Sequence, residues 1–240
     1  SSSDATMRIF IGILTTADRY EFRNLLRTVY GTQSPIGAHV DVRYIICNFT
    51  GNRHKLVMVG LERRKYNDII ILDCVENMDQ GKTYDYFSSL PPRLLTSNSM
   101  IYPPYHFVAK ADDDSYIRLQ SLAGALRRNV SKNDMYFGRM NVSPELSYMV
   151  GPLYLVSWDI VEWISVSDVP KKNLFGSEDI VFGEWLRDGN RGNNKYDIGE
   201  RLHDFPSPDT PCPLNFSQAT MIVHQLKTRE RWIETLDHFH

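Results

Sequence analysis

The sequence has few of the features that mark membrane or nucleic-acid-binding proteins. Its 240 residues contain no apolar run of about 18 residues, so no segment is predicted to span a membrane. The 27 basic residues are balanced by 29 acidic ones and form no long stripe, so nucleic acid is not an expected partner. There is also no internal repeat and no low-complexity linker. With 42% hydrophobic residues the chain can bury a substantial core, and we expect a single domain over 1–240.

Cysteine is scarce. Cys47, Cys74 and Cys212 form no CxxC pair and no zinc-type spacing, which argues against a structural zinc site. One disulfide with a free thiol and three buried thiols are both compatible with this pattern. No secretory signal is visible, but several Asn-x-Ser/Thr sequons favour the secretory pathway. These sequons lie at Asn48, Asn129, Asn141 and Asn215.

Short apolar runs alternate with stretches of helical periodicity, which predicts an α/β fold with a mixed, mostly parallel sheet covered on both faces. Strands are predicted at 7–14, 40–47, 68–72, 107–109, 135–138, 151–157 and 219–223. Helices are predicted at 21–30, 52–64, 79–90, 119–128, 158–166, 178–186 and 227–236. The helix at 79–90 should stop at Pro91. The proline-rich segment 205–213 should be irregular.

Three consecutive acids, Asp112, Asp113 and Asp114, follow the apolar run that begins at Phe107. Ligands of open α/β sheets bind at the carboxyl ends of strands. Clustered carboxylates repel one another unless a cation is bound, and hard divalent ions prefer oxygen ligands. The alternative is a solvated acidic turn. His224 also follows an apolar strand, and imidazole with carboxylates suits manganese-like ions, although a lone histidine is more often structural.

Other charged residues allow two interpretations each. Arg23 and Arg27 share one face of a helix that opens after a strand, where they either are solvated or hold an anion. Lys82 in the first turn of a helix is unfavourable for the helix dipole, which suggests a separate purpose unless it is an ordinary surface lysine. Glu178 and Asp179 open a helix that Ser177 can cap, and both acids could simply complement the dipole.

Five stretches stand in order along the chain: IFIGILTTADRYEFRNLLRTVYG, KYNDIIILDCVENMDQGKT, FVAKADDDSYI, GPLYLVSWD and SEDIVFG. Together they resemble glycosyltransferase family 31, which contains β-1,3-galactosyltransferases, β-1,3-N-acetylglucosaminyltransferases and Fringe enzymes. The resemblance implies a GT-A fold, with a Rossmann-like nucleotide-sugar half at about 7–118 continuous with an acceptor half at about 119–240. It also implies a UDP-sugar donor, a Mn²⁺ or Mg²⁺ cofactor and inversion at the anomeric carbon.

The resemblance also assigns roles by position. It implies that Asp179 is the catalytic base and that Asp114 and His224, in VHQLK, bind the metal. The residues that would contact the nucleotide-sugar are Thr15, Arg23, Arg27, Lys82, Asp112 and Asp113. The residues that would line the acceptor or sugar pocket are Glu178, Gly151 and Trp158.

We therefore expect transfer of a sugar, most simply galactose, to a hydroxyl of a glycan or glycoprotein in a β-1,3 linkage. The rivals are an N-acetylglucosaminyltransferase of the same fold, an inactive glycan-binding module and, more weakly, a glycoside hydrolase. The resemblance implies a type II membrane protein of the Golgi lumen whose anchor is not in this chain. There are two departures from the family: Pro152-Leu153 stands in a glycine run, and Tyr30 stands in place of tryptophan. Both bear on the particular sugar more than on the reaction class, and the first predicts a reshaped donor or acceptor pocket.

Overall fold

The computed structural model describes residues 6–49, 51–95, 101–128, 130–206 and 216–240. Strands and helices alternate through the first half, as the apolar periodicity predicts. The strands are β1 (Met7–Leu14), β2 (Ala38–Cys47), β3 (Ile69–Leu72), β4 (Phe107–Asp112), β5 (Tyr116–Ile117), β6 (Met135–Val142), β7 (Ser147–Ser157), β8 (Asn194–Asp197), β9 (Leu202–Asp204) and β10 (Ile222–His224). The α-helices are α1 (Tyr20–Gly31), α2 (Arg53–Tyr66), α3 (Lys82–Leu94), α4 (Leu119–Arg127), α5 (Trp158–Val166), α6 (Asp168–Lys171), α7 (Glu178–Asp188) and α8 (Arg229–Phe239). A 3₁₀ turn, η1, covers Gly199–Arg201.

The main sheet has seven strands in the order β3-β2-β1-β4-β7-β6-β8. The first four strands are parallel, β7 is antiparallel to β4 and β6, and β8 is parallel to β6. The predicted mixed, mostly parallel sheet is therefore confirmed. Because β2 lies on one side of β1 and β4 on the other, the strand order reverses between β1 and β4, which is where open α/β sheets bind ligands.

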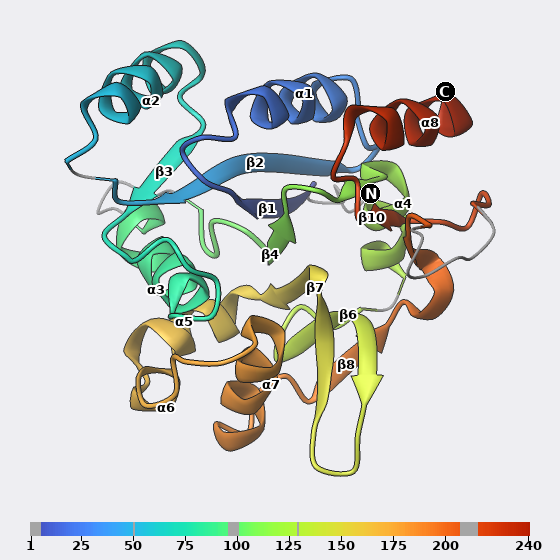
Figure 1. Ribbon diagram of the computed structural model, residues 1–240. Helices are drawn as coiled ribbons and strands as arrows, with labels where there is room; N and C mark the ends of the chain where they lie inside the picture. The colour runs from blue at the N-terminus through green and yellow to red at the C-terminus, as the bar shows by residue number, and fades with distance from the viewer. Residues whose placement is uncertain (1–5, 50, 96–100, 129, 207–215) are drawn as a thin grey trace.

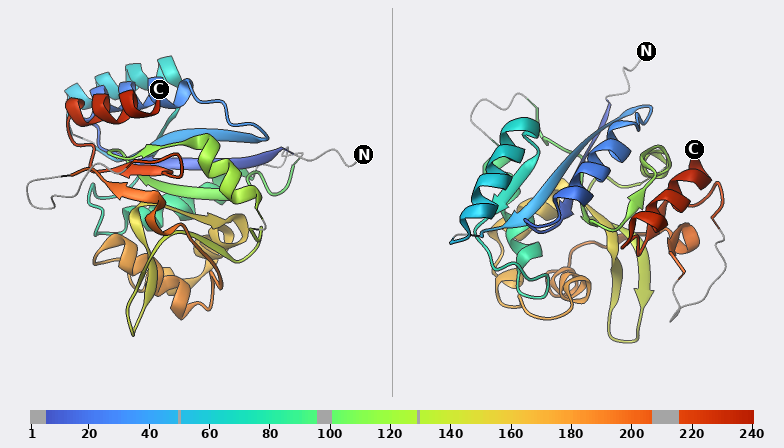
Figure 2. Two further views of the ribbon diagram at one scale, coloured as in Figure 1. Left: turned by 90° about the vertical axis from the view of Figure 1, so that its right-hand side faces the viewer. Right: turned by 45° about the horizontal axis from the view of Figure 1, so that its top comes forward.

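Helices cover both faces of the main sheet, with α1, α2 and α8 on one side and α3, α5 and α7 on the other (Figures 1 and 2). Alternate residues of β1 show why two cores form. Ile9, Ile11 and Ile13 belong to the core that includes α1 and α8, whereas Phe10 and Leu14 belong to the core that includes α3, α5 and α7. A strand buried on both faces reads as a continuous apolar run, and β1 is such a strand.

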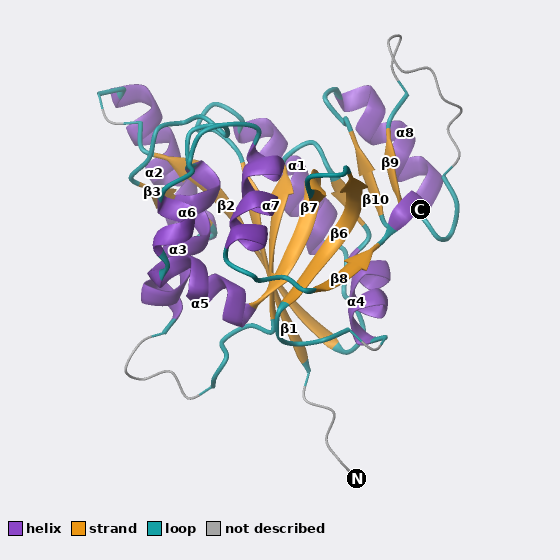
Figure 3. Ribbon diagram, turned by 90° about the horizontal axis from the view of Figure 1, so that it is seen from below, coloured by secondary structure: helices purple, strands orange, loops and turns teal. Residues whose placement is uncertain are grey.

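A second, three-stranded sheet has the order β5-β10-β9, with β10 antiparallel to β5 and parallel to β9. Figure 3 shows β9 and β10 beside the main sheet. It connects the segment that follows the acidic run to the end of the chain. β5 begins at Tyr116, two residues after Asp114, and β10 ends at His224. The pairing of Val223 with Tyr116 thus brings residues more than 100 positions apart to one place.

The prediction that α3 would stop at Pro91 is wrong, because the helix continues through both prolines to Leu94. A proline inside a helix loses one backbone hydrogen bond to the preceding turn. Here that loss falls only in the last turn, and the Pro91 carbonyl still accepts a hydrogen bond from the Leu95 N–H at 2.9 Å. The predicted strands at 135–138 and 151–157 were too short, since β6 and β7 form a longer hairpin that extends to Val142 and Ser147.

Cys47 and Cys74 form a disulfide that joins the ends of β2 and β3, which resolves part of the cysteine question. Cys212 lies outside the described residues, and so does most of the proline-rich segment predicted to be irregular. Among the described residues, no helix combines the length and apolar character needed to cross a bilayer.

Candidate functional site

A cleft of about 580 Å³ opens at the carboxyl ends of β1 and β4, within the size range of small-molecule sites. It contains most of the residues singled out from the sequence. Those in its lining are Thr15, Lys82, Asp112, Asp113, Asp114, Gly151, Glu178, Asp179 and His224. Arg19, Glu76, Asp79, Lys110 and Lys227 also line it. The structure therefore gathers side chains from both halves of the chain at the strand-order reversal.

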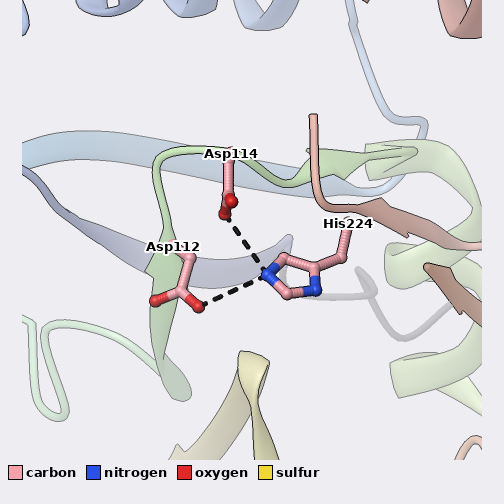
Figure 4. A group of neighbouring side chains, drawn as sticks. All are labelled: Asp112, Asp114 and His224. Atoms are coloured by element: carbon pink, nitrogen blue, oxygen red, sulfur yellow. Dashed lines mark ion pairs between the residues drawn. The ribbon is translucent and has the colours of Figure 1, made fainter. Parts of the chain in front are cut away.

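Asp112, Asp114 and His224 form a compact group whose ligand atoms lie within 4.8 Å of one another. His224 Nε2 is 3.3 Å from Asp114 Oδ1 and 3.9 Å from Asp112 Oδ2. Figure 4 shows the imidazole edge directed between the two carboxylates. Two hard oxygen donors and one imidazole nitrogen make a donor set that suits Mn²⁺ and related divalent ions.

The far side of the His224 ring is held by Asp204, whose Oδ1 lies 2.6 Å from Nδ1. A carboxylate at this position fixes the ring orientation and keeps a proton on Nδ1, which leaves Nε2 to face the cleft. Burial disfavours the charged imidazolium, but the contacts with Asp114 and Asp204 outweigh it and raise the pKa of His224 to about 9. A cation at Nε2 must therefore displace a proton at neutral pH.

Lys110 lies on β4 with a side chain that is only 1% exposed, and it organises the floor of the cleft. Its Nζ donates to Asp112 Oδ1 at 2.7 Å and to the Gly151 carbonyl at 2.8 Å, and it is 2.9 Å from Glu178 Oε2. Burial alone would lower the pKa of Lys110, but Asp112 and Glu178 outweigh it and raise that pKa. This buried cation orients Asp112 and ties β4 to β7 and α7.

Glu178 belongs to this network more than to the open cleft. Its other oxygen accepts a hydrogen bond from the buried Tyr154 hydroxyl. Burial raises the pKa of Glu178, although Lys110 opposes the shift. With Lys110 on one oxygen and Tyr154 on the other, Glu178 acts as a structural link between the cleft and the α7 core.

Asp113 is not part of the Asp112–Asp114–His224 group and instead binds the end of β1. Its Oδ2 accepts from Thr15 Oγ1 at 2.6 Å and from Arg19 Nε at 2.5 Å. Burial raises the pKa of Asp113, with the hydrogen bond from Thr15 and the charge of Arg19 opposing it. The three consecutive acids thus have different partners, and Asp113 fixes the loop between β1 and α1 beside the cleft.

Asp179 lies at the start of α7 and is partly exposed to the cleft. Its Oδ2 accepts the Gly151 N–H at 3.1 Å. Its Oδ1 accepts the Ile180 N–H at 2.9 Å and the Ser177 hydroxyl at 3.0 Å. Ser177 occupies the N-cap position of α7 but makes no capping hydrogen bond with its side chain, so it serves Asp179 instead. A carboxylate has about four acceptor positions, so one remains for a ligand proton.

Lys82, in the first turn of α3, has a nearly fully buried side chain. Its Nζ donates to the Thr15 carbonyl at 2.6 Å and pairs with Glu76. Burial lowers the pKa of Lys82, while Glu76 opposes the shift. The unfavourable position in the helix is therefore compensated by these partners at the edge of the cleft.

Arg23 and Arg27 do not line the cleft. Arg23 is fully buried and binds both oxygens of Glu62, at 2.8 and 2.7 Å. Arg27 binds both oxygens of Asp68, at 2.7 and 2.9 Å, and reaches Glu62 at 2.7 Å. Both guanidinium groups tie α1 to α2, and Arg27 also ties it to Asp68 directly before β3. This is a third arrangement besides a solvated face and an anion site. The geometry gives no support for nucleotide contacts from either residue.

Trp158 also lies away from the cleft. The β4–β7 register pairs Phe107 with Ser157, so Trp158 follows the end of β7 that is remote from Asp112, and its side chain is buried in the core. Pro152 and Leu153 are buried as well, and of this run only Gly151 lines the cleft. The geometry therefore does not support a pocket role for Trp158 or the expected reshaping of the pocket by Pro152 and Leu153.

The site contains residues that sequence analysis did not select. Asp204 and Arg19 hold His224 and Asp113, and Lys110 holds Asp112. Lys110 stands in the quoted FVAKADDD segment and could have been selected from it. Asp204 carried no signal, because it is 20 residues from His224 and the β9–β10 pairing alone brings them together.

Comparison with known proteins finds relatives among galactosyltransferases. A family model described as "Galactosyltransferase" matches residues 21–146. The chain is 28% identical over 209 residues to beta-1,3-galactosyltransferase pvg3 of Schizosaccharomyces pombe, covering 66% of this chain and 55% of that protein. It is 25% identical over 229 residues to probable beta-1,3-galactosyltransferase 13 of Arabidopsis thaliana, covering 83% of this chain and 62% of that protein. The chain thus spans 55–62% of the length of these two relatives.

Among solved structures, the chain resembles an active-site mutant of LgtC with a TM-score of 0.51 and 11% identity, over 97% of this chain and 96% of the other. At this identity the likeness concerns the fold alone. It agrees with the GT-A fold predicted from the sequence, a mixed sheet with its ligand cleft at the strand-order reversal.

Proposed function

Because the chain belongs to the galactosyltransferase family, we propose that it transfers galactose from UDP-galactose to a glycan hydroxyl, forming a β-1,3 linkage with inversion. The names of both relatives, which specify β-1,3 galactosyl transfer, support this choice of sugar and linkage. The observation that carries the proposal is the cleft at the end of β4, where the Asp112–Asp114–His224 group faces Asp179 and Lys82 across one space.

Asp112, Asp114 and His224 would hold a divalent cation, Mn²⁺ or Mg²⁺. Their donor atoms fit such an ion in type and in spacing. When bound, the cation would supply positive charge to the diphosphate leaving group. Lys110 and Asp204 contribute by holding Asp112 and His224 in fixed orientations, so that little reorganisation is needed on binding.

Asp179 is the residue we assign as general base. Inversion requires a carboxylate that takes the acceptor hydroxyl's proton on the face opposite the leaving group. Asp179 fits because it lines the cleft and is held by three donors with acceptor capacity remaining. Glu178 fits less well, because both of its oxygens are engaged by Lys110 and Tyr154.

We assign the donor nucleotide to the side formed by β1 and β4. Thr15 and Asp113 lie there at the strand ends, and Lys82 closes the edge. Residues 7–118 would then form the nucleotide-sugar half and residues 119–240 the acceptor half of one domain. The continuous hydrogen bonding of β4 to β7 supports a single domain.

We propose that the acceptor is a glycan or glycoprotein in the secretory pathway and that the reaction takes place in the Golgi lumen. The Cys47–Cys74 disulfide supports it, because disulfides persist in oxidising compartments. Asn48 and Asn141 are exposed, which is compatible with glycosylation of these sequons.

Calorimetry with UDP and Mn²⁺, followed by turnover of a panel of UDP-sugars, tests the proposal. We expect UDP binding that requires the cation, and turnover that is fastest with UDP-galactose. Preference for UDP-N-acetylglucosamine would replace the sugar and keep the reaction class. Glycan binding without turnover of any donor would indicate a binding module, and absence of UDP binding with Mn²⁺ present would refute the nucleotide-sugar site.

A further inference from the structure

A second hollow, of about 770 Å³, lies beside α4 and shares no lining residue with the candidate active site. It is formed by one face of α4, by η1 and by the turn that precedes β10. Its charged lining residues are Arg127, Arg128 and Arg201, and no aspartate or glutamate is among its lining residues. Because the chain as a whole has more acidic than basic residues, this segregation of charge is a local property of the fold.

Arg201 is the central cation of this hollow. Its Nε donates to the Ala219 carbonyl at 3.0 Å and its Nη2 to the Ser121 hydroxyl at 2.9 Å. Both partners are neutral, and within the described part of the chain no carboxylate pairs with Arg201. Burial and the neighbouring charges of Arg128 and Arg118 lower the pKa of Arg201. A partly buried guanidinium held by neutral groups and facing other cations is electrostatically unfavourable until an anion is added.

Arg127 and Arg128 have their side chains exposed at the end of α4. The negative end of the helix dipole accounts for cations at this position. It does not account for Arg201, which belongs to another element, or for Arg118, whose guanidinium binds the carbonyls of Gln218 and Thr220 beside the hollow. Neither Arg127 nor Arg128 makes a side-chain hydrogen bond or ion pair with the described residues, so their donors are available to a ligand.

We propose that the hollow formed by Arg127, Arg128 and Arg201 binds an oxyanion, and that its carrier is an acidic saccharide. The oxyanion follows from the arginines, since guanidinium groups recognise phosphate, sulfate and carboxylate through paired hydrogen bonds. The saccharide carrier rests on the proposed function, because a galactosyltransferase handles glycans. Free inorganic phosphate presents the same chemistry and is the other source of such a group.

The position of the hollow suits a role separate from catalysis. The turn at Ala219 leads into β10, which ends at His224 in the candidate active site. The separation along the chain is five residues, from 219 to 224, or at most about 17 Å in extended conformation. An acidic sugar can therefore occupy the hollow while the cleft remains free, either several sugars away from the accepting hydroxyl or on a separate glycan.

The test measures the binding affinity of a sulfated oligosaccharide, with the same oligosaccharide after desulfation as the control ligand. We expect the sulfated form to bind at least about tenfold more tightly, with an affinity that falls as salt is raised. Arg127→Gln/Arg128→Gln should lose this preference. The matched control is Arg63→Gln/Arg64→Gln, which removes two exposed arginines from the last turn of α2. Both double variants change the net charge equally and touch no core residue.

Three outcomes distinguish the possibilities. Loss of oligosaccharide binding in Arg127→Gln/Arg128→Gln (the α4 variant) but not in Arg63→Gln/Arg64→Gln (the α2 variant) supports the site. Displacement of the sulfated oligosaccharide by millimolar inorganic phosphate would identify the free anion as an equal ligand of the site. Equal binding of sulfated and desulfated forms, or equal losses in both variants, overturns the proposal. Displacement by UDP with Mn²⁺ also overturns it, since the anion would then lie in the active-site cleft. Transfer to a neutral acceptor should be unchanged in the α4 variant, which separates this inference from the proposed function.

Discussion

Asp204 should control how tightly the Asp112–Asp114–His224 group holds a divalent cation, although it does not belong to that group. Replacing Asp204 with alanine removes the acceptor that lies 2.6 Å from His224 Nδ1. The imidazole then loses its fixed orientation. It also loses the neighbouring negative charge of Asp204, which strengthens Nε2 as a ligand of the metal. Outer carboxylates of this kind are typically worth about 10- to 100-fold in metal affinity, or about 1.4 to 2.7 kcal/mol.

Proton competition makes the effect depend on pH. The pKa of His224 is about 9 in the cation-free protein, so near pH 7 a proton on the ring weakens the apparent metal affinity about 100-fold. Asp204 is one cause of that raised pKa, so the variant suffers less competition at low pH. The loss of affinity in Asp204→Ala should therefore be smaller near about pH 6.5 than near about pH 8.5, where proton competition is much weaker.

Calorimetric titration of Mn²⁺ in the presence of saturating UDP, at both pH values, measures the effect. Asp204→Asn should lose less affinity than Asp204→Ala, because its amide oxygen can still accept the Nδ1 proton. Asp237→Ala on α8 is the control for loss of an exposed acid. Equal Mn²⁺ affinity in wild type and Asp204→Ala at both pH values would refute the positioning of His224 by Asp204.

Three further predictions concern the base, the buried ion network and the disulfide. Asp179→Asn should lower kcat by about 10²- to 10⁴-fold while UDP affinity, measured by calorimetry, is unchanged; undiminished turnover would move the base elsewhere. Glu62→Gln should lower the free energy of unfolding in urea by about 3–5 kcal/mol, because it leaves Arg23 buried beside a neutral partner. Burial opposes ionisation of Glu62, but the hydrogen bonds from Arg23 and Arg27 outweigh it and lower the pKa of Glu62. The stabilisation by the Glu62 carboxylate is therefore present above the unfolded-state pKa near about 4.3 and is lost as the pH falls through the lower folded-state pKa. The variant should accordingly lose this part of the acid dependence, and an unchanged profile would contradict the assignment. Cys47→Ser/Cys74→Ser should lower the free energy of unfolding by about 3–4 kcal/mol, because the unfolded chain regains the entropy lost in closing a loop with a sequence separation of 27. A thermal midpoint equal to that of the oxidised wild type would argue against the disulfide.

The sequence was sufficient for the fold class and for the centre of the site because these depend on local patterns. Continuous apolar runs such as β1 indicate strands buried on both faces, and their alternation with helices indicates the parallel half of the sheet. The acids at the end of β4 indicated a ligand site, since the end of a buried strand is where open sheets bind ligands. His224 was a candidate because it also follows an apolar strand, and family motifs, which record residues in fixed order, gave Asp179 its role as the base.

The tertiary structure decided which charges meet. Arg23 and Arg27 have the helix spacing of an anion site, yet the packing of α1 against α2 places Glu62 beside both guanidinium groups. Asp204 reaches His224 only through the pairing of β9 with β10. Arg201 faces Arg128 only because η1 lies beside α4. Sequence periodicity fixes which face of an element is buried, whereas the partner of a buried charge is set by contacts between elements distant in the chain, and that information exists only in the folded molecule.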